Sequence, residues 1–343
     1  MFNPKYQITD EISRYLSDIA EIKSLVDHAK LLPSREFTLR RKVNIKLAHS
    51  STSIEGNSLE EYQVNNLLDG GKVIAEKNEI REVQNYFRAL HLVDKYTAKS
   101  EITINDILKL HKTVIDGLVK ESKVGVFRPG SIYITNQDKV MYVGPDTKKV
   151  RGLVEELLSW QTTSQDIHPV IRAGLLHYQF VTIHPFSDGN GRTARLLTLL
   201  HLYQSGWDFR KSLALDEFYN SDRLSYYQAL QTGKTYKERQ LSELTGWITY
   251  FVRGFWESTL KLKEQVLSLQ VGKGDIASRH LNLDELKIID FVLTLGKITS
   301  SDVVDILGVP RRTAQFKLNK LASYLILDKI CSGPSTYYKL VKI

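Results

Sequence analysis

The stretch HPFSDGNGRTAR, from His184 to Arg195, places a histidine, an aspartate and two arginines around a Gly-Asn-Gly turn. Apolar residues recur at helical spacing in the segment before it, from 168 to 183. The segment after it is apolar over most of its circumference until Ser205-Gly206. The sequence therefore predicts two buried helices joined by this turn, and their burial should hold the turn rigid.

The turn has the features of a phosphate site. Glycines on both sides of Asn190 let its backbone N–H groups converge, and the start of the next helix favours an anion. Arg192 and Arg195 are close enough on that helix to reach the same anion. Asp188 would repel the anion unless a cation such as Mg²⁺ lies between them. His184 is suited to accept a proton from an attacking hydroxyl.

A purely structural interpretation competes with this one. A Gly-Asn-Gly after a helix is commonly a cap and a turn, and a histidine beside a proline is more often packed than basic. For the turn alone, that interpretation is favoured. The combination of a base, an acid and two arginines between two apolar helices favours the chemical interpretation.

HPFSDGNGRTAR resembles the signature of the Fic proteins, His-x-Phe-x-Asp/Glu-Gly-Asn-Gly-Arg-x-x-Arg, with every defined position filled. The resemblance implies a mainly α fold, a Fic-type helical bundle with a β-hairpin flap. It also implies an enzyme, a protein adenylyltransferase that transfers AMP from ATP to a Ser, Thr or Tyr hydroxyl of a target protein and to itself.

The same resemblance implies a role for each signature residue. His184 would be the general base, Asp188 the Mg²⁺ ligand, and Asn190 with nearby backbone amides the anion hole. Arg192 and Arg195 would hold the outer phosphates. The implied catalytic residues are His184, Asn190 and Arg192, and the implied ATP-binding residues are His184, Gly189, Asn190, Gly191, Arg192, Thr193, Ala194, Arg195, Glu55, Tyr226 and Tyr227. Gly191 favours nucleotidyl transfer, because the phosphorylating branch of the superfamily resembles this motif with a lysine there.

A second motif, SSTSIEGN, ends a predicted helix at Glu55-Gly56-Asn57. A carboxylate in the last turn opposes the helix dipole, so Glu55 is either solvated or paired with a cation. The motif is similar to the inhibitory helix of Fic proteins, here Ser51, Glu55 and Gly56. The resemblance implies that Glu55 pairs with Arg195 and occupies the place of the outermost phosphate of ATP.

The rest of the first 270 residues is predicted to be largely helical. Helices are expected at about 8–31, 33–54, 58–98 with an interruption at Gly70-Gly71, 103–118 with Thr103 or Asn105 as the cap, 150–161, 218–230 with Asn220 or Ser221 as the cap, and 243–269. Tyr226 and Tyr227 are most simply core residues. They also resemble the Fic segment whose tyrosines line the adenine pocket, and spacing does not say which of them contacts the base.

Between 125 and 145 the pattern alternates around a polar turn, which predicts a β-hairpin. It is either a surface hairpin without a role or, as in Fic proteins, a flap at about 131–143 that pairs with the backbone of the target protein. Arg128 also fits the family pattern.

The last segment, 275–343, predicts three helices and two strands, the order of a winged helix-turn-helix. Its third helix carries Arg311, Arg312, Lys317 and Lys320, which suggests DNA as a partner through 299–320. The segment has ten Lys and Arg against seven Asp and Glu, an excess of only +3. A winged helix used only for homodimer or target contacts is therefore an open alternative.

Composition sets the remaining expectations. The chain has 343 residues, a net charge of +8, one cysteine and no apolar run long enough to span a membrane. We expect a cytoplasmic protein with an N-terminal helical region at 1–100 carrying the inhibitory helix, a Fic core at 101–270 and the winged helix at 275–343. Two alternatives are kept: a DNA-binding regulator whose Fic-like domain senses nucleotide, and a protein de-AMPylase in which Glu55 aligns a water molecule.

Overall fold

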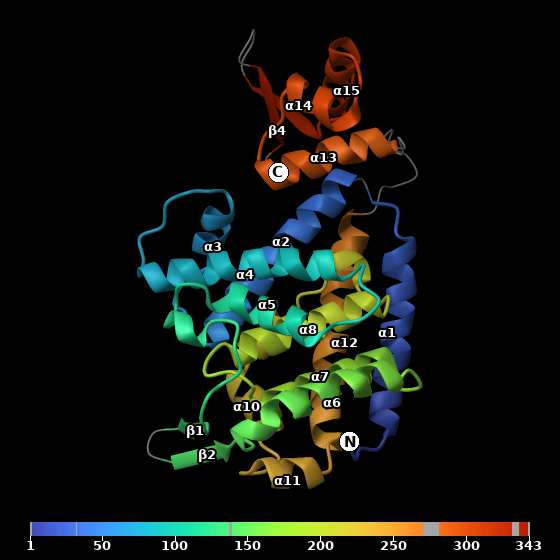
Figure 1. Cartoon of the computed structure of the whole chain (residues 1–343). Coiled ribbons are helices and arrows are strands. Elements are labelled where there is room, and N and C mark those ends of the chain that lie inside the picture. The colour runs from blue at the N-terminus through green and yellow to red at the C-terminus, as the bar shows by residue number, and fades with distance from the viewer. Residues whose placement is uncertain (1, 32, 137–138, 270–280, 331–335, 342–343) are drawn as a thin grey trace. The chain divides into compact units, whose positions relative to one another are not determined.

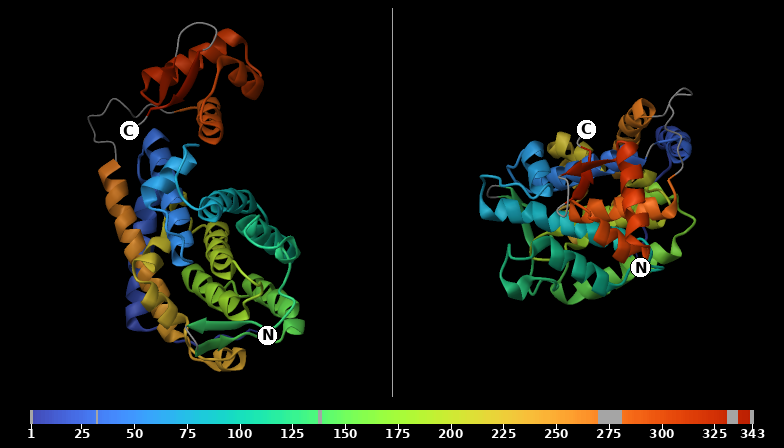
Figure 2. Two further views of the ribbon diagram at one scale, coloured as in Figure 1. Left: turned by 90° about the vertical axis from the view of Figure 1, so that its left-hand side faces the viewer. Right: turned by 90° about the horizontal axis from the view of Figure 1, so that it is seen from above.

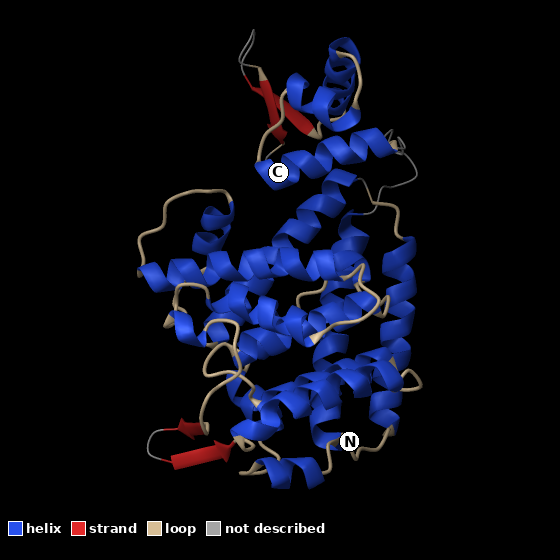
Figure 3. Ribbon diagram, viewed as in Figure 1, coloured by secondary structure: helices blue, strands red, loops and turns tan. Residues whose placement is uncertain are grey.

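The computed structural model describes the whole chain except residues 1, 32, 137–138, 270–280, 331–335 and 342–343. It divides into two compact units, one formed by 1–29 with 39–268 and the other by 30–38 with 269–343. Helices make up most of both units, and the strands form two short hairpins (Figure 3). The predicted mainly α fold is confirmed.

The first unit is a helical bundle around α7 and α8 (Figure 1). Its helices are α1 (Asp10–His28), α2 (Pro33–Ile54, from residue 39 on), α3 (Glu61–Leu68), α4 (Lys77–Tyr96), α5 (Ile104–Ile115), α6 (Val150–Thr163), α7 (Pro169–Ile183), α8 (Asn190–Gln204), α9 (Leu215–Ser221), α10 (Arg223–Leu230), α11 (Tyr236–Leu241) and α12 (Thr245–Leu269). Nearly every side chain of α7 and α8 is buried. Burial on all sides explains why both sequences are apolar around most of the helix.

Local capping sets several of these helix starts. Thr103 caps α5, where its hydroxyl accepts from the N–H of Asp106. The predicted cap at Asn220 or Ser221 is wrong, because both residues belong to α9. Asp222 caps α10 instead, and its carboxylate accepts from the N–H of Ser225 at 3.0 Å.

The predicted hairpin is present as β1 (Tyr133–Asn136) and β2 (Lys139–Val143), paired antiparallel with an irregularity after Ile134. Both views place it next to α11 (Figures 1 and 2), where the N–H of Val143 donates to the carbonyl of Lys234 at 2.8 Å. The side chain of Tyr142 in β2 is fully buried, and its hydroxyl donates to the carbonyl of Thr182 at 2.5 Å. The hairpin is therefore anchored to the end of α7.

The second unit contains α13 (Leu283–Leu295), α14 (Ser300–Leu307), α15 (Arg311–Ser323), β3 (Leu327–Ile330) and β4 (Tyr337–Leu340). Ile288, Val303 and Leu318, one from each helix, are fully buried in a common core with Tyr338 of β4. The element order is the predicted one, and its identification as a winged helix stays a prediction. The expected boundary between the Fic core and the winged helix, at 270–275, lies outside the described residues, and so does the stretch 331–335 between the two strands.

Membrane-spanning segments were not expected from the sequence. In the part of the chain that the structure describes, no helix combines the length and the apolar character needed to cross a bilayer.

Candidate functional site

Two residues in left-handed backbone conformations shape the turn between α7 and α8. His184 ends α7 at φ 50° and ψ 62°, and Gly189 precedes α8 at φ 73° and ψ 11°. A Cβ at Gly189 would lie 2.6 Å from Cγ2 of Ile115, so this position requires glycine. His184 is a non-glycine residue in a strained conformation, which is a frequent feature of functional sites.

Side chains on both sides close this turn. The side-chain amide of Asn190 donates to the carbonyl of Phe186 and accepts from its N–H, both at 2.9 Å. The buried ring of Phe186 stacks on His111, with ring centroids 3.6 Å apart, and Nε2 of His111 donates to the carbonyl of Asp188 at 3.0 Å. Asn190 thus shapes the turn, while its part in an anion hole stays a prediction.

His184 is placed to act as a neutral base. Burial lowers its pKa to about 4, against the opposing effects of the Val181 carbonyl and the Glu55 carboxylate. Nδ1–H donates to the carbonyl of Val181 at 3.2 Å. With the proton on Nδ1, Nε2 keeps its lone pair at neutral pH and can accept a proton.

Arg192 lies almost fully buried in the first turn of α8. Its Nη1 donates to a carboxylate oxygen of Glu82 in α4, and its Nη2 donates to Oδ1 of Asp188 at 3.3 Å. Nε is buried and has no partner among the described residues. A buried N–H without an acceptor is costly, and a phosphate oxygen is the kind of acceptor that it lacks.

Arg195, one turn later, is paired with the end of α2. Its Nε donates to Oγ of Ser51 at 2.7 Å, and its Nη2 donates to the Ser51 carbonyl and to Oε1 of Glu55, each at 2.8 Å. Asp216 lies 3.8 Å from Nε. Burial alone lowers the pKa of Arg195, but the nearby carboxylates outweigh it and raise the pKa above its usual value. This arginine is therefore charged at any physiological pH.

Two glycines permit the observed position of the Glu55 carboxylate. A Cβ at Gly191 would collide with Oε1 of Glu55. Gly56 follows Glu55 at φ 103°, a backbone conformation that side chains strongly disfavour. The end of α2 thus brings a carboxylate directly against the start of α8.

Asp188 offers a single exposed carboxylate. Its side chain is 54% exposed, and Oδ1 accepts from the N–H of Gly189 at 2.5 Å. Among the described residues there is no group of three or more His, Cys, Asp or Glu side chains that would hold a metal ion. One carboxylate fits a Mg²⁺ ion shared with substrate phosphates, which is how this ion is commonly held, and does not fit a protein-only metal centre.

Other predicted nucleotide contacts differ in accessibility. Thr193 donates its hydroxyl to the carbonyl of Gly189 at 2.8 Å, and the side chain of Ala194 is fully buried. Tyr226 is 1% exposed, and its hydroxyl is bonded to Nε2 of His177 at 2.8 Å. Tyr227 is 48% exposed and donates to the carbonyl of Ile54 at 3.2 Å. Of the two tyrosines, Tyr227 is the one that a ligand can reach.

Arg128 connects the hairpin region to the turn. Its Nε donates to the carbonyl of His184 at 2.9 Å, and its Nη2 donates to the carbonyl of Pro145 at 2.5 Å. Its own N–H donates to the carbonyl of Pro185 at 2.9 Å. The strained backbone at His184 is therefore held from the side of the hairpin.

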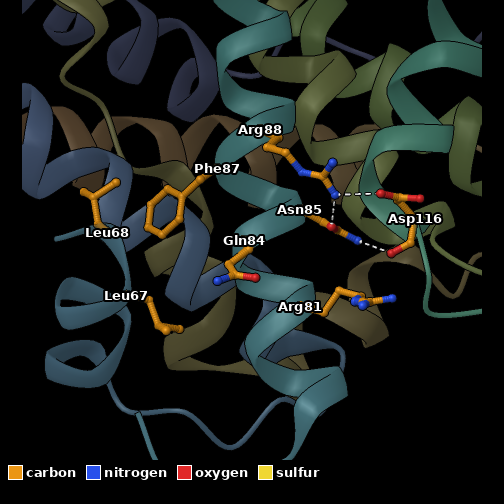
Figure 4. A pocket seen from close by; sticks show the side chains of 8 residues that line it. All are labelled: Leu67, Leu68, Arg81, Gln84, Asn85, Phe87, Arg88 and Asp116. Carbon is orange, nitrogen blue, oxygen red and sulfur yellow. Dashed lines mark hydrogen bonds and ion pairs between the residues drawn. The ribbon is translucent and has the colours of Figure 1, made fainter. Parts of the chain in front are cut away.

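A separate hollow of about 520 Å³ lies between α3, α4 and the residue that follows α5 (Figure 4). Leu67, Leu68 and Phe87 supply its apolar lining, and Arg88 forms an ion pair with Asp116 across it at 2.9 Å. No lining residue belongs to the signature turn.

Comparison with known families identifies the domain. Residues 101–202 match the Fic/DOC family, a range that includes α5, the hairpin, α6, α7 and the turn into α8. These residues match a Fic domain.

Curated relatives agree with this assignment. The chain is 36% identical over 166 residues to the protein adenylyltransferase Fic of Drosophila willistoni, covering 46% of this chain and 32% of that protein. It is 33% identical over 205 residues to the Drosophila virilis protein of the same name, covering 58% of this chain and 39% of that one. The chain thus spans 32% to 39% of the length of these relatives.

Solved structures show the same fold. A crystal structure of a Fic family protein from Desulfovibrio desulfuricans G20 matches with a TM-score of 0.66 and 24% identity, over 99% of this chain and 98% of that one. A Fic domain containing signaling protein from Bacteroides thetaiotaomicron VPI-5482 matches with a TM-score of 0.63 and 20% identity, over 77% and 100%. At these identities the likeness concerns the fold, and it confirms the expected Fic-type architecture.

Three residues of the Fic domain site were missed by the sequence analysis: Glu82, His111 and Asp216. Each lies on a helix outside the signature, and each reaches the signature only through folding. The buried Asp216 accepts from the hydroxyl of Tyr86 at 3.0 Å and lies beside Arg195. The one signal for Asp216 in the sequence was an acidic residue at a core position of a helix.

Proposed function

We propose that this Fic protein transfers AMP from ATP to a hydroxyl side chain of a target protein and of itself. The observation that carries the proposal is the pair of buried arginines beside a neutral histidine, each arginine with an N–H that has no acceptor among the described residues. Phosphate oxygens would satisfy those donors. The activity in the names of the curated relatives is the same, and supports it.

In this mechanism the side chains of the site position the phosphates of ATP and transfer one proton. Nε2 of His184 takes the proton from the target hydroxyl, whose oxygen attacks the α-phosphorus while the bond to pyrophosphate breaks. Arg192 and Arg195 hold the outer phosphates, and Asp188 would hold Mg²⁺, which supplies charge neutralisation at the phosphates. Tyr227, as the accessible tyrosine, would line the adenine pocket.

Glu55 would restrain this reaction. Its carboxylate already uses the Arg195 donor that the outermost phosphate needs, and places negative charge where that phosphate would sit. The position of Glu55 also supports a second candidate, removal of AMP. The Glu55 carboxylate is near enough to His184 to raise the pKa of its imidazole. A water molecule aligned by Glu55 would then be the nucleophile.

The target would bind along the hairpin. Tyr133 and Val140 are exposed on it, and an added strand is held by backbone bonds that do not depend on the sequence of the target. This mode would bring a hydroxyl to His184, since Arg128 and Tyr142 anchor the hairpin beside the end of α7.

The test of transfer is incubation with labelled ATP and Mg²⁺, followed by intact-mass analysis. Addition of the mass of AMP to this chain is the expected result. No labelled product with ATP, for either the wild type or Glu55→Gly, would overturn transfer. Release of AMP from a modified protein would support the second candidate.

DNA is a weaker candidate partner, through the second unit. Lys317 and Lys320 are paired with Asp284 at 3.0 Å and Glu285 at 2.7 Å. Arg311 and Arg312 are the exposed cations of α15, next to an exposed Phe316. Retardation of duplex DNA that weakens in Arg311→Ala with Arg312→Ala would support DNA binding. No retardation at low salt would favour a protein contact, including a homodimer.

A further inference from the structure

The first arginine of the signature is held by a carboxylate from outside it. Glu82 lies on α4, and one of its oxygens accepts from Nη1 of Arg192. The two side chains are 18% and 4% exposed. The other ion-pair partner, Asp188, is far more exposed and lies at 3.3 Å. Because a buried guanidinium without a close partner is strongly destabilising, Glu82 is the main counter-charge of Arg192.

Glu82 is itself held in place. Its second oxygen accepts from Nδ2 of Asn57 at 2.8 Å, and Asn57 is buried two residues beyond Glu55. Both oxygens of Glu82 therefore have a donor of fixed position. Glu79, one turn earlier on α4, accepts from the N–H of Ser58 at 2.8 Å and forms no ion pair with Arg192.

This arrangement fixes the direction of the guanidinium while leaving donors for a ligand. A guanidinium has five N–H donors, and Glu82 and Asp188 accept from one each. The buried Nε has no partner in the described part of the chain. If Asp188 binds a cation, as proposed above, Glu82 still accepts a hydrogen bond from Arg192 and keeps its guanidinium in place.

We propose that Glu82 is a positioning residue, which orients Arg192 toward the phosphates of the bound nucleotide. The inference rests on the proposed function for the identity of that nucleotide, ATP. It differs from a role in docking the inhibitory segment. That role is shared by Glu79 and Asn57, and of these three residues Glu82 is the one that contacts Arg192.

The experiment uses the full chain in a Glu55→Gly background, so that inhibition does not mask binding. Glu82→Gln, which keeps size and loses charge, should weaken ATP binding measured by calorimetry by about tenfold or more, the effect typical of partners that orient ligand-binding side chains. The KM for ATP should rise with it. Glu82→Asp should recover part of the loss, and the matched control Glu79→Gln should bind ATP as the background does.

A cycle with Arg192→Ala separates positioning from a structural role. In that variant Glu82→Gln should cause no further loss of ATP affinity, since Glu82 acts through the missing guanidinium. Equal ATP affinity in Glu82→Gln and Glu79→Gln would overturn the inference, and so would the same loss with and without Arg192. Normal ATP binding without any AMP transfer would overturn the proposed function alone, because the binding comparison would still stand.

Discussion

At the scale of single residues, His184 combines an unusual backbone conformation with a lowered pKa. The residue follows α7 in a left-handed conformation, and its Nδ1–H donates to the Val181 carbonyl. Burial lowers its pKa, so the imidazole is neutral without help from an acidic partner. A strained backbone and a lowered pKa are both features that residues of functional sites often show, in line with the role proposed for this ring.

Replacing His184 by Ala should leave ATP binding intact and lower AMP transfer by about a hundred- to ten-thousand-fold, the usual contribution of a general base. With a pKa of about 4, His184 stays deprotonated as the pH falls through 6.5, so transfer should persist to about pH 5. Labelled-AMP transfer rates between pH 4.5 and 8 provide the measurement. A loss of rate centred at pH 6.5 would contradict the assignment.

Asp188→Ala should abolish the dependence of transfer on Mg²⁺ together with most of the activity, because positioning and charge neutralisation supply most of the catalysis in phosphoryl chemistry. Titration of Mg²⁺ into transfer assays, with Asp188→Asn as a matched variant, measures this. If wild-type transfer proceeds at full rate in EDTA, Asp188 has no metal to hold.

At the scale of elements, the end of α2 lies against the start of α8. The Glu55 carboxylate at this contact would compete with the outermost phosphate proposed to bind there. The Glu55 carboxylate fits there because position 191 is glycine, and its ion pair with Arg195 joins residues 140 positions apart. The segment after α2 is also held by α4, where the side chain of Asn57 and the N–H of Ser58 donate to the carboxylates of Glu82 and Glu79. Relief of inhibition in this arrangement would require only a local displacement of one carboxylate.

Glu55→Gly should therefore raise self-modification well above the wild-type level, by about tenfold or more if one charge-assisted bond is removed. Adding Arg195→Ala should cancel the gain, since the gain depends on freeing that arginine. Time courses of AMP incorporation measure both variants. An unchanged or slower rate in folded Glu55→Gly would exclude inhibition and shift weight to Glu55 as the group that aligns water.

At the scale of the molecule, the surroundings of four histidines in the first unit disfavour the charged imidazole. Burial lowers the pKa of His111 and His184 to about 4, and of His177 and His201 to about 3. Their usual value is about 6.5. The unfolded chain therefore takes up protons below about pH 6.5 while the folded chain does not until about pH 4.

The free energy of unfolding should accordingly be largest above pH 6.5 and fall as the pH drops from 6.5 to 4. We expect the melting temperature to decrease by at least about 5 °C between pH 7 and pH 5. Calorimetric melts across this range test it, with His177→Gln as the variant that should flatten the decrease. Equal melting temperatures at pH 7 and pH 5 would show that these histidines are not buried as neutral groups.

The sequence by itself determined the helical character, the hairpin and the signature turn, because these depend on neighbouring residues. Apolar periodicity predicts α7 and α8, and glycines flanking Asn190 predict the turn between them. The cap of α10 was misplaced, since Asp222 and the preceding polar residues offer equivalent local signals. Which of them caps depended on where α9 ends.

Only the tertiary structure decided which charges meet. Glu82 and Arg192 are 110 positions apart, and His111 and Asp188 are 77 apart. Neither pairing has a local signal, because an acid or a histidine on an amphipathic helix is as compatible with solvent as with a buried partner. The burial that lowers the pKa of His184 also comes from distant helices. The sequence thus specified the reactive groups, while packing set their partners, their protonation and their direction.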